Sequence, residues 1–152
     1  MAINTKKALT LPELLVAVAI FVLAFAGIVV SYIACLDLNE ISKNSSIAVH
    51  AVKDRIEEIK NRPFDQIKAI YHNVSFTTAG LNGKGISYVD DSSPCLLLIT
   101  VSFSWRQRNG RIIGEDLNLN GQLNAGEDKN NNGMLDSLVE VATRIFKREV
   151  CP

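Results

Sequence analysis

Hydrophobic positions follow two different patterns along the chain. The first is a continuous apolar run from Leu14 to Leu36, 23 residues without a charged side chain. A helix rises about 1.5 Å per residue, so this length crosses a hydrocarbon layer about 30 Å thick with some tilt. A secretory signal peptide has a shorter apolar region, of about 7 to 15 residues, with a cleavage site behind it. The run therefore predicts a membrane-spanning helix.

The second pattern is amphipathic and follows directly. Apolar side chains recur at near-heptad spacing on one face of a helix, opposite charged residues: Ile41, Ala48, Val52, Ile56 and Ile59. Pro63 ends the pattern, because proline cannot continue a helix. One helix of 52 residues is predicted from Leu11 to Arg62, with its first half in lipid or a filament core and its second half packed on a globular head.

The remaining residues predict a small β head. Tyr71–Pro94 is rich in Gly, Asp and Ser and predicts a loop with short strand pieces. Leu96–Gln107 is rich in β-branched and aromatic residues and predicts a strand, whose partner is Leu138–Phe146. An antiparallel register with Val101 opposite Ile145 gathers one apolar face: Leu97, Ile99, Val101, Phe103, Trp105, Val139, Val141 and Ile145. The predicted class is α+β, a long helix packed on a small antiparallel sheet.

The three cysteines fall at different places in this scheme. The same register puts Cys95 opposite Cys151, and a disulfide there would close a loop of more than fifty residues. Such a bond would stabilise the fold by about 4 kcal/mol. Two buried free thiols are the alternative. Cys35 lies at the outer end of the apolar run and is expected to behave as a small hydrophobe.

The start of the long helix has its own chemistry. Thr10 as N-cap and Glu13 three residues later make a capping box, with Pro12 in the first turn. Capping accounts for Glu13 without a further role, but not for a carboxylate beside so long an apolar segment, where an unpaired charge is costly. Lys6 and Lys7 precede the run, which predicts an N-terminus in the cytoplasm and a head outside.

Residues 6–14, Lys-Lys-Ala-Leu-Thr-Leu-Pro-Glu-Leu, resemble the class III leader of type IV pilins and type II secretion pseudopilins. In that family a prepilin peptidase removes a short basic leader and N-methylates the first mature residue. The resemblance implies cleavage after Ala8 and methylation of Leu9. It also implies that Glu13, as fifth mature residue, pairs with the terminal amine of a neighbouring subunit. The family more often has Gly before the cut and Phe after it, and a Pro where this chain has Val30.

Residues 55–65, Arg-Ile-Glu-Glu-Ile-Lys-Asn-Arg-Pro-Phe-Asp, resemble the end of the long helix in minor pilins of the PilV kind and in pseudopilin I. The two resemblances imply a minor structural subunit of a type II secretion pseudopilus or a type IV pilus. Its partners would be other pilin subunits, prepilin peptidase and the inner membrane, with the head in the periplasm or at the cell surface. The implied division is leader 1–8, transmembrane or filament-core helix 9–36, amphipathic helix 37–62 and β head 63–152 with a loop insertion at 115–137.

A metal-binding motif lies between the two predicted strands. Asp116–Glu127 carries oxygen-bearing side chains at its positions one, three, five, nine and twelve, and glycine at six. This is the spacing of an EF-hand-type calcium loop, in which alternate residues point inward on a tight turn and the last carboxylate closes the site. The predicted calcium ligands are Asp116, Asn118, Asn120, the main-chain carbonyl of Gln122, Asn124 and Glu127.

A second loop of similar spacing begins at once. Its predicted ligands are Asp128, Asn130, Asn132, Met134 and Asp136, but its twelfth position is Val139, with Glu140 one residue away. With no helix between them, the loops depart from an EF-hand pair and resemble the repeated calcium loops of dockerin-like or thrombospondin-type segments. A solvated Asn- and Gly-rich hairpin loop without metal is the alternative.

Charge narrows the range of functions. Sixteen basic and sixteen acidic residues cancel, which argues against a generic nucleic-acid binder. Glu115–Glu140 nevertheless holds six acidic residues against Lys129 alone. Arg106, Arg108 and Arg111 beside it are expected to balance local charge, and His50 and His72 to face solvent. No nucleophile–base pair or carboxylate pair stands out, so an enzyme is not expected.

Two other functions stay open. One is a calcium-binding module held outside the cell by an uncleaved signal anchor, with no filament role; it predicts that the leader is retained and that Glu13 is replaceable. The other is a filament subunit whose head binds a ligand, as in DNA uptake or adhesion, which would call for a basic and aromatic surface groove.

Overall fold

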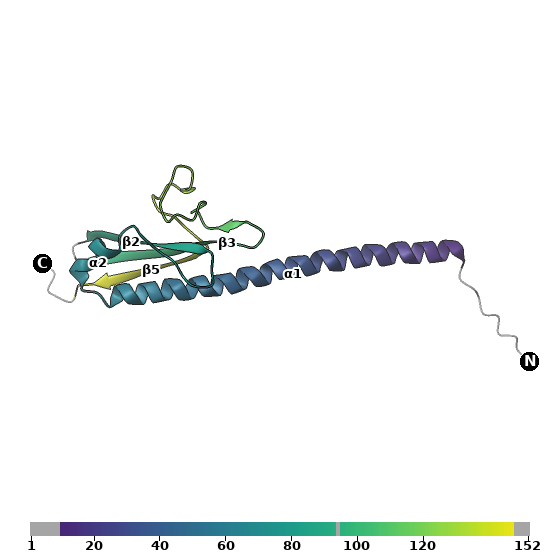
Figure 1. Cartoon of the computed structure of the whole chain (residues 1–152), viewed down its shortest axis with the longest axis horizontal. Helices are drawn as coiled ribbons and strands as arrows, with labels where there is room; N and C mark the ends of the chain where they lie inside the picture. Colours follow the sequence, from purple (N-terminus) through teal and green to yellow (C-terminus); the bar gives the residue numbers. More distant parts are fainter. Residues whose placement is uncertain (1–9, 94, 148–152) are drawn as a thin grey trace, which may run out of the picture. The chain divides into compact units, whose positions relative to one another are not determined.

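The computed structural model describes residues 10–93 and 95–147. Two helices, α1 (Leu11–Lys60) and α2 (Phe64–Tyr71), precede one sheet (Figure 1). Its strands are β1 (Val74–Phe76), β2 (Gly83–Ser93), β3 (Leu96–Arg106), β4 (Ile112–Ile113) and β5 (Val139–Phe146). The chain divides into two compact units between Asn39 and Glu40, within α1. The α+β prediction is confirmed as one long N-terminal apolar helix and a small antiparallel sheet.

The first unit contains the apolar part of α1. Every residue from Leu11 to Asn39 is exposed, and α1 is the helix among the described residues that is long and apolar enough to cross a membrane. The Ser31 hydroxyl donates to the Gly27 carbonyl oxygen at 2.9 Å, so this polar side chain is satisfied inside the helix. An exposed apolar surface of this kind is typical of a membrane-contacting or protein-contacting segment.

The capping box at the helix start is confirmed in one of its two bonds, that from the Thr10 N–H to the Glu13 carboxylate, whereas the Thr10 hydroxyl acts as a donor. The Thr10 backbone N–H donates to Glu13 Oε2 at 3.2 Å, and the Thr10 hydroxyl donates to the same oxygen at 3.0 Å. At the other end α1 stops at Lys60, two residues before the predicted end. Pro63 lies at the N-cap of α2, a helix that the sequence analysis did not predict.

The second unit is built around β3. This strand pairs in antiparallel fashion with β2 on one side and with β5 and β4 on the other, and β1 pairs with β2. The expectation of a loop with short strand pieces over residues 71–94 fits β1, which has 3 residues, but is wrong for β2, which is a strand of 11 residues. Its glycines are packing requirements: a Cβ on Gly85 would meet the Phe76 ring at 2.3 Å. Glycine was therefore a misleading loop signal here.

The β3–β5 pair has the predicted strands but not the predicted register. Val101 lies opposite Val141, and Ile145 lies opposite Leu97. The difference is four residues, an even number, which leaves every side chain on its predicted face. The alternating pattern therefore could not distinguish the two registers. Across from Cys95 the Lys147 backbone N–H donates to the Cys95 carbonyl at 3.0 Å, so the register that placed Cys151 there is wrong.

The apolar core lies between the sheet and the second part of α1 (Figure 1). Ala48, Val52 and Ile59 on α1 are fully buried, and so are Val101 and Trp105 on β3. The predicted apolar face is confirmed, with Val141 and Ile145 only partly buried at the edge strand. The other face of β3 is polar yet also buried, through Thr100, Ser102 and Ser104.

Candidate functional site: a double loop on the outer face of the sheet

The polar face of the sheet is covered by residues 115–137, here called the double loop (Figure 1). Leu135, 1% exposed, packs against Ile86 and Tyr88 of β2. The Leu135 N–H donates to the Tyr88 hydroxyl at 2.9 Å, and the Ser102 hydroxyl donates to the Leu135 carbonyl. Burial raises the pKa of Tyr88, which keeps its hydroxyl neutral. The double loop is therefore part of the folded head.

The first loop, Asp116–Glu127, turns around a buried aspartate. Asp116 is 2% exposed, and its Oδ1 and Oδ2 accept the N–H groups of Asn120 at 3.1 Å and Gly121 at 2.8 Å. The Asn120 Oδ1 accepts the Gln122 N–H at 2.7 Å. Leu119 and Gly121 have positive φ, at 57° and 71°. The side-chain oxygens of positions one and five are thus turned inward on a tight backbone.

The second loop, Asp128–Asp136, repeats this geometry twelve residues later. Asp128 Oδ1 and Oδ2 accept the N–H groups of Asn132 at 3.1 Å and Gly133 at 2.8 Å. The Asn132 Oδ1 accepts the Met134 N–H at 2.8 Å. Asn131 and Gly133 have positive φ, both near the values in the first loop. The two loops are therefore two copies of one turn.

Glu127 closes the first loop from its twelfth position. This residue is 4% exposed, and its two carboxylate oxygens each accept a main-chain N–H at 3.0 Å, one from Leu117 and one from Asn124. These donors stand at positions two and nine. Burial acts to raise the pKa of Glu127, but the hydrogen bonds from Asn124 and Leu117 outweigh it and hold the pKa below its usual range.

Glu115 takes the same place in the second loop. It is 8% exposed, and its Oε1 and Oε2 accept the N–H groups of Lys129 and Asp136, both at 3.1 Å. These donors are again positions two and nine, now of the second loop. The EF-hand spacing predicts this carboxylate at the twelfth position of the loop, so Glu115 was not among the predicted ligands. A signal was present, because the pair Glu-Asp recurs at twelve-residue spacing, at Glu115-Asp116 and Glu127-Asp128.

Glu140 lies outside this arrangement. Glu140 is exposed. Its pKa is nevertheless raised, first by partial desolvation of the carboxyl group and then by the nearby charges of Asp136 and Glu115. The nearby carboxylates of Asp136 and Glu115 thus add to the effect of desolvation on the pKa of Glu140. A bound cation would relieve this repulsion.

The donor chemistry of the double loop suits calcium. Most of its polar side chains offer carboxylate or amide oxygens, which are ligands that a hard cation prefers. Across residues 10–93 and 95–147, no three side chains of His, Cys, Asp or Glu converge on a point where they could hold a metal ion. A calcium site here would combine a carboxylate with amide oxygens, those of Asn118, Asn120 and Asn124 in the first loop or of Asn130 and Asn132 in the second, and with main-chain carbonyls.

The other predicted site residues are distributed as follows. Glu13 is exposed at the start of α1, whereas Ala8, Leu9 and Cys151 lie outside the described residues. Cys95 is disulfide-bonded and Cys35 is a free exposed thiol. The pairing of Cys95 with Cys151 stays a prediction.

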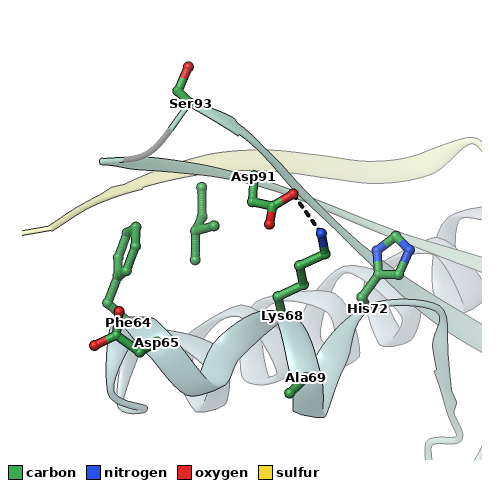
Figure 2. A pocket seen from close by; sticks show the side chains of 8 residues that line it. Phe64, Asp65, Lys68, Ala69, His72, Asp91 and Ser93 are labelled. Atoms are coloured by element: carbon green, nitrogen blue, oxygen red, sulfur yellow. Dashed lines mark hydrogen bonds and ion pairs between the residues drawn. The ribbon is translucent and has the colours of Figure 1, made fainter.

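A surface pocket of about 640 Å³ lies beside α2 (Figure 2). Its walls include Phe64, Leu97 and His72, whose Nδ1 accepts the Val89 N–H at 3.2 Å. Lys68 Nζ and Asp91 Oδ1 form an ion pair across it at 2.7 Å. Because these opposite charges satisfy each other, the pocket does not suggest a reaction.

No protein-family model, curated protein or solved structure matches the chain.

Proposed function

We propose that this chain is a membrane-anchored structural subunit of a pilus-like filament, a minor subunit of a type II secretion pseudopilus or type IV pilus. The observation that carries the proposal is the exposed, uncharged surface of α1 from Leu14 to Leu36, which begins one residue after Glu13. Lipid covers such a surface before assembly, and neighbouring helices cover it in a filament. On this proposal prepilin peptidase cleaves after Ala8 and methylates Leu9.

Glu13 is placed for a second partner. Both donors of Thr10 bind one carboxylate oxygen, Oε2, and no hydrogen bond among the described residues is made to Oε1. That oxygen would accept the terminal amine of a neighbouring subunit. A charge-assisted pair in an apolar surrounding is strong and specific, because both partners lack water as an alternative.

The double loop adds a calcium-dependent part to the proposal. One ion would occupy the first loop, with Glu127 as closing ligand, and a second ion would occupy the second loop, with Glu115 in that role. Asn in place of Asp at positions three and five lowers the charge of each site, which suits the millimolar calcium outside cells. The ions would neutralise the acidic excess and hold the double loop on the sheet.

The filament proposal is tested by the mass and N-terminal sequence of the protein from membranes that contain prepilin peptidase. A mature chain that begins at N-methylated Leu9 is expected. Glu13→Ala should then be processed but fail to enter filaments, whereas Asp37→Ala, an exposed carboxylate behind the apolar run, should assemble normally. A retained leader and no assembly would instead favour the uncleaved calcium-binding anchor, and equal assembly of both variants would overturn the role given to Glu13.

The calcium proposal is tested by titration of the detergent-solubilised full chain. Two ions per chain are expected for the wild type. Glu127→Gln should lose the first-loop ion and Glu115→Gln the second-loop ion, while Glu140→Gln keeps both. Loss of an ion in Glu140→Gln with full binding in Glu115→Gln would contradict the assignment, and no binding by the wild type would overturn the calcium site as a whole.

A further inference from the structure

The turn between β3 and β4 displays three exposed arginines in six residues: Arg106, Arg108 and Arg111. We call residues 106–111 the arginine hairpin. None of the ion pairs among the described residues includes these side chains. Internal hydrogen bonds order the turn, from the Gln107 N–H to the Arg111 carbonyl at 2.8 Å and from the Gly110 N–H to the Gln107 carbonyl at 2.9 Å. The positive charges are therefore held on a preformed scaffold.

One contact ties the arginine hairpin to α1. Glu40 Oε1 accepts the backbone N–H of Arg108 at 2.7 Å. Glu40 follows Leu36, the last residue of the uncharged run, by four positions. Lys43 is exposed three residues further on and adds a fourth basic group. The basic turn is thus bound to the part of α1 where the chain leaves its apolar segment.

This place has a specific environment when the helix spans a bilayer. The headgroup layer on each side of the hydrocarbon is about 5 to 8 Å thick, which is the rise of about four helical residues. Arginine matches phosphate oxygens in bidentate geometry and is weakly hydrated. A basic side chain near an anionic surface favours the bound state by about fivefold, within a Debye length of about 8 to 10 Å.

We infer that the arginine hairpin docks on the anionic phospholipid headgroups of the membrane that α1 crosses. The inference rests on the membrane anchoring in the proposed function. Docking would hold the head against the bilayer before assembly, and extraction into a filament would have to break it. Acidic side chains of the head would repel anionic lipid, but several of them already accept main-chain hydrogen bonds. Glu40 accepts the Arg108 N–H, and the buried carboxylates of Glu115, Asp116 and Glu127 accept main-chain N–H groups of the double loop.

The test compares the full chain in nanodiscs of neutral phosphatidylcholine with nanodiscs in which about one third of the lipid is phosphatidylglycerol. Amide hydrogen exchange of the peptide that contains residues 106–111 is measured with one protein per disc in millimolar calcium. Exchange should be several-fold slower in the anionic discs. The difference should vanish in about 1 M salt, where the Debye length falls to about 3 Å.

A triple variant, Arg106→Gln, Arg108→Gln and Arg111→Gln, should exchange equally fast in both kinds of disc. A matched variant that removes three basic groups elsewhere on the head, Lys53→Gln, Lys60→Gln and Arg144→Gln, should keep the slow exchange in anionic discs. Equal wild-type exchange in both discs, with the protein inserted, would overturn the inference and leave the anchoring intact. Failure to insert would instead contradict the anchoring itself. Protection that requires two proteins per disc would assign the turn to a second copy and also overturn the inference.

Discussion

Gly121 shows how strongly a single residue of the double loop is constrained. Its φ is 71°, a conformation that costs other L-residues about 1 kcal/mol. A Cβ at this position would also meet the Ser75 Cβ at 2.4 Å, because the first loop packs directly on β1. Gly126 has a similar φ of 86°, but a Cβ there would meet nothing within 4 Å. The two glycines thus separate backbone strain from steric contact.

This difference predicts unequal effects of the same substitution. Gly126→Ala should lower the free energy of unfolding by about 1 kcal/mol, from strain alone. Gly121→Ala should lower it by about 1 to 3 kcal/mol more, because the loop must also move away from Ser75. Urea denaturation of the detergent-solubilised chain measures both. Equal losses in the two variants would show that the contact with Ser75 is unimportant.

Glu58 gives a prediction about acid. The Arg55 guanidinium, hydrogen-bonded to Glu58 at 2.8 Å, is the largest cause that lowers the pKa of this carboxyl group, and the Tyr71 hydroxyl adds to it. A lowered pKa stabilises the fold above the ordinary value of 4.5, and this stabilisation is lost as pH falls below it. The side chain is 47% exposed, so screening limits the effect to about 0.5 kcal/mol.

Wild type and Glu58→Gln should therefore differ in stability at pH 6 and converge as the pH approaches 3. Thermal unfolding at several pH values tests this. Glu57→Gln is the control variant. The Glu57 carboxylate is exposed and makes no side-chain hydrogen bond within the described residues. A gap between wild type and Glu58→Gln that widens in acid would contradict the assignment.

At the scale of elements, the sequence predicted what depends on periodicity and missed what depends on tertiary contacts. The strands around Val101 and Val141 were found because apolar residues alternate there. β2 was missed because Gly83 and Gly85, which make room for Phe76, Phe103 and Trp105, resemble turn residues. The β3–β5 register was misplaced because a long connection fixes no turn geometry and an even shift preserves the faces.

The candidate site shows the same division. The tight turn of the first loop could be predicted because its residues follow one another along the chain, while calcium binding there stays a prediction. The closing residue of the second loop was not predicted, since Glu115 precedes its own loop partners by at least thirteen residues and reaches them only through the fold. In the structure, both glutamates of the double loop, Glu115 and Glu127, are buried, and this burial shows that Glu115 has a place equivalent to that of Glu127.

The double loop should be sensitive to calcium removal. Trypsin can cut after Lys129, an exposed residue whose N–H is bound to Glu115 at 3.1 Å. Calcium should slow this cut at least several-fold, because the unbound loops carry repelling carboxylates and open locally more often. Cleavage after Arg108, which lies outside the double loop, serves as internal control. Equal rates after Lys129 with calcium and with chelator would contradict a calcium-stabilised loop.

At the scale of the whole molecule, α1 belongs to two units with different partners. Its residues up to Asn39 are exposed, whereas Ala48, Val52 and Ile59 are buried in the head. One continuous helix thus has a part that is packed on the sheet and a part whose side chains are exposed.

Two isoleucines of α1 test this division. Ile59→Ala should lower the free energy of unfolding of the head by about 2 to 5 kcal/mol, because Ile59 is fully buried. Ile33→Ala, at a position 55% exposed, should change it by less than about 0.5 kcal/mol in detergent. Denaturation followed by near-ultraviolet circular dichroism of Trp105 reports on the head. A large loss in Ile33→Ala would show that the two units fold as one.

If the double loop binds two calcium ions as proposed, the crossed positions of Glu115 and Glu127 would couple the two ions thermodynamically. Each glutamate is the sequence neighbour of an aspartate that serves the other loop, Glu115 beside Asp116 and Glu127 beside Asp128. The first ion to bind would then order backbone that the second ion also needs, and the second ion would meet a smaller loss of conformational entropy. Calcium uptake would be cooperative, with a steeper isotherm than two independent sites allow. The head would then respond to a narrow range of calcium concentration as a switch between two states.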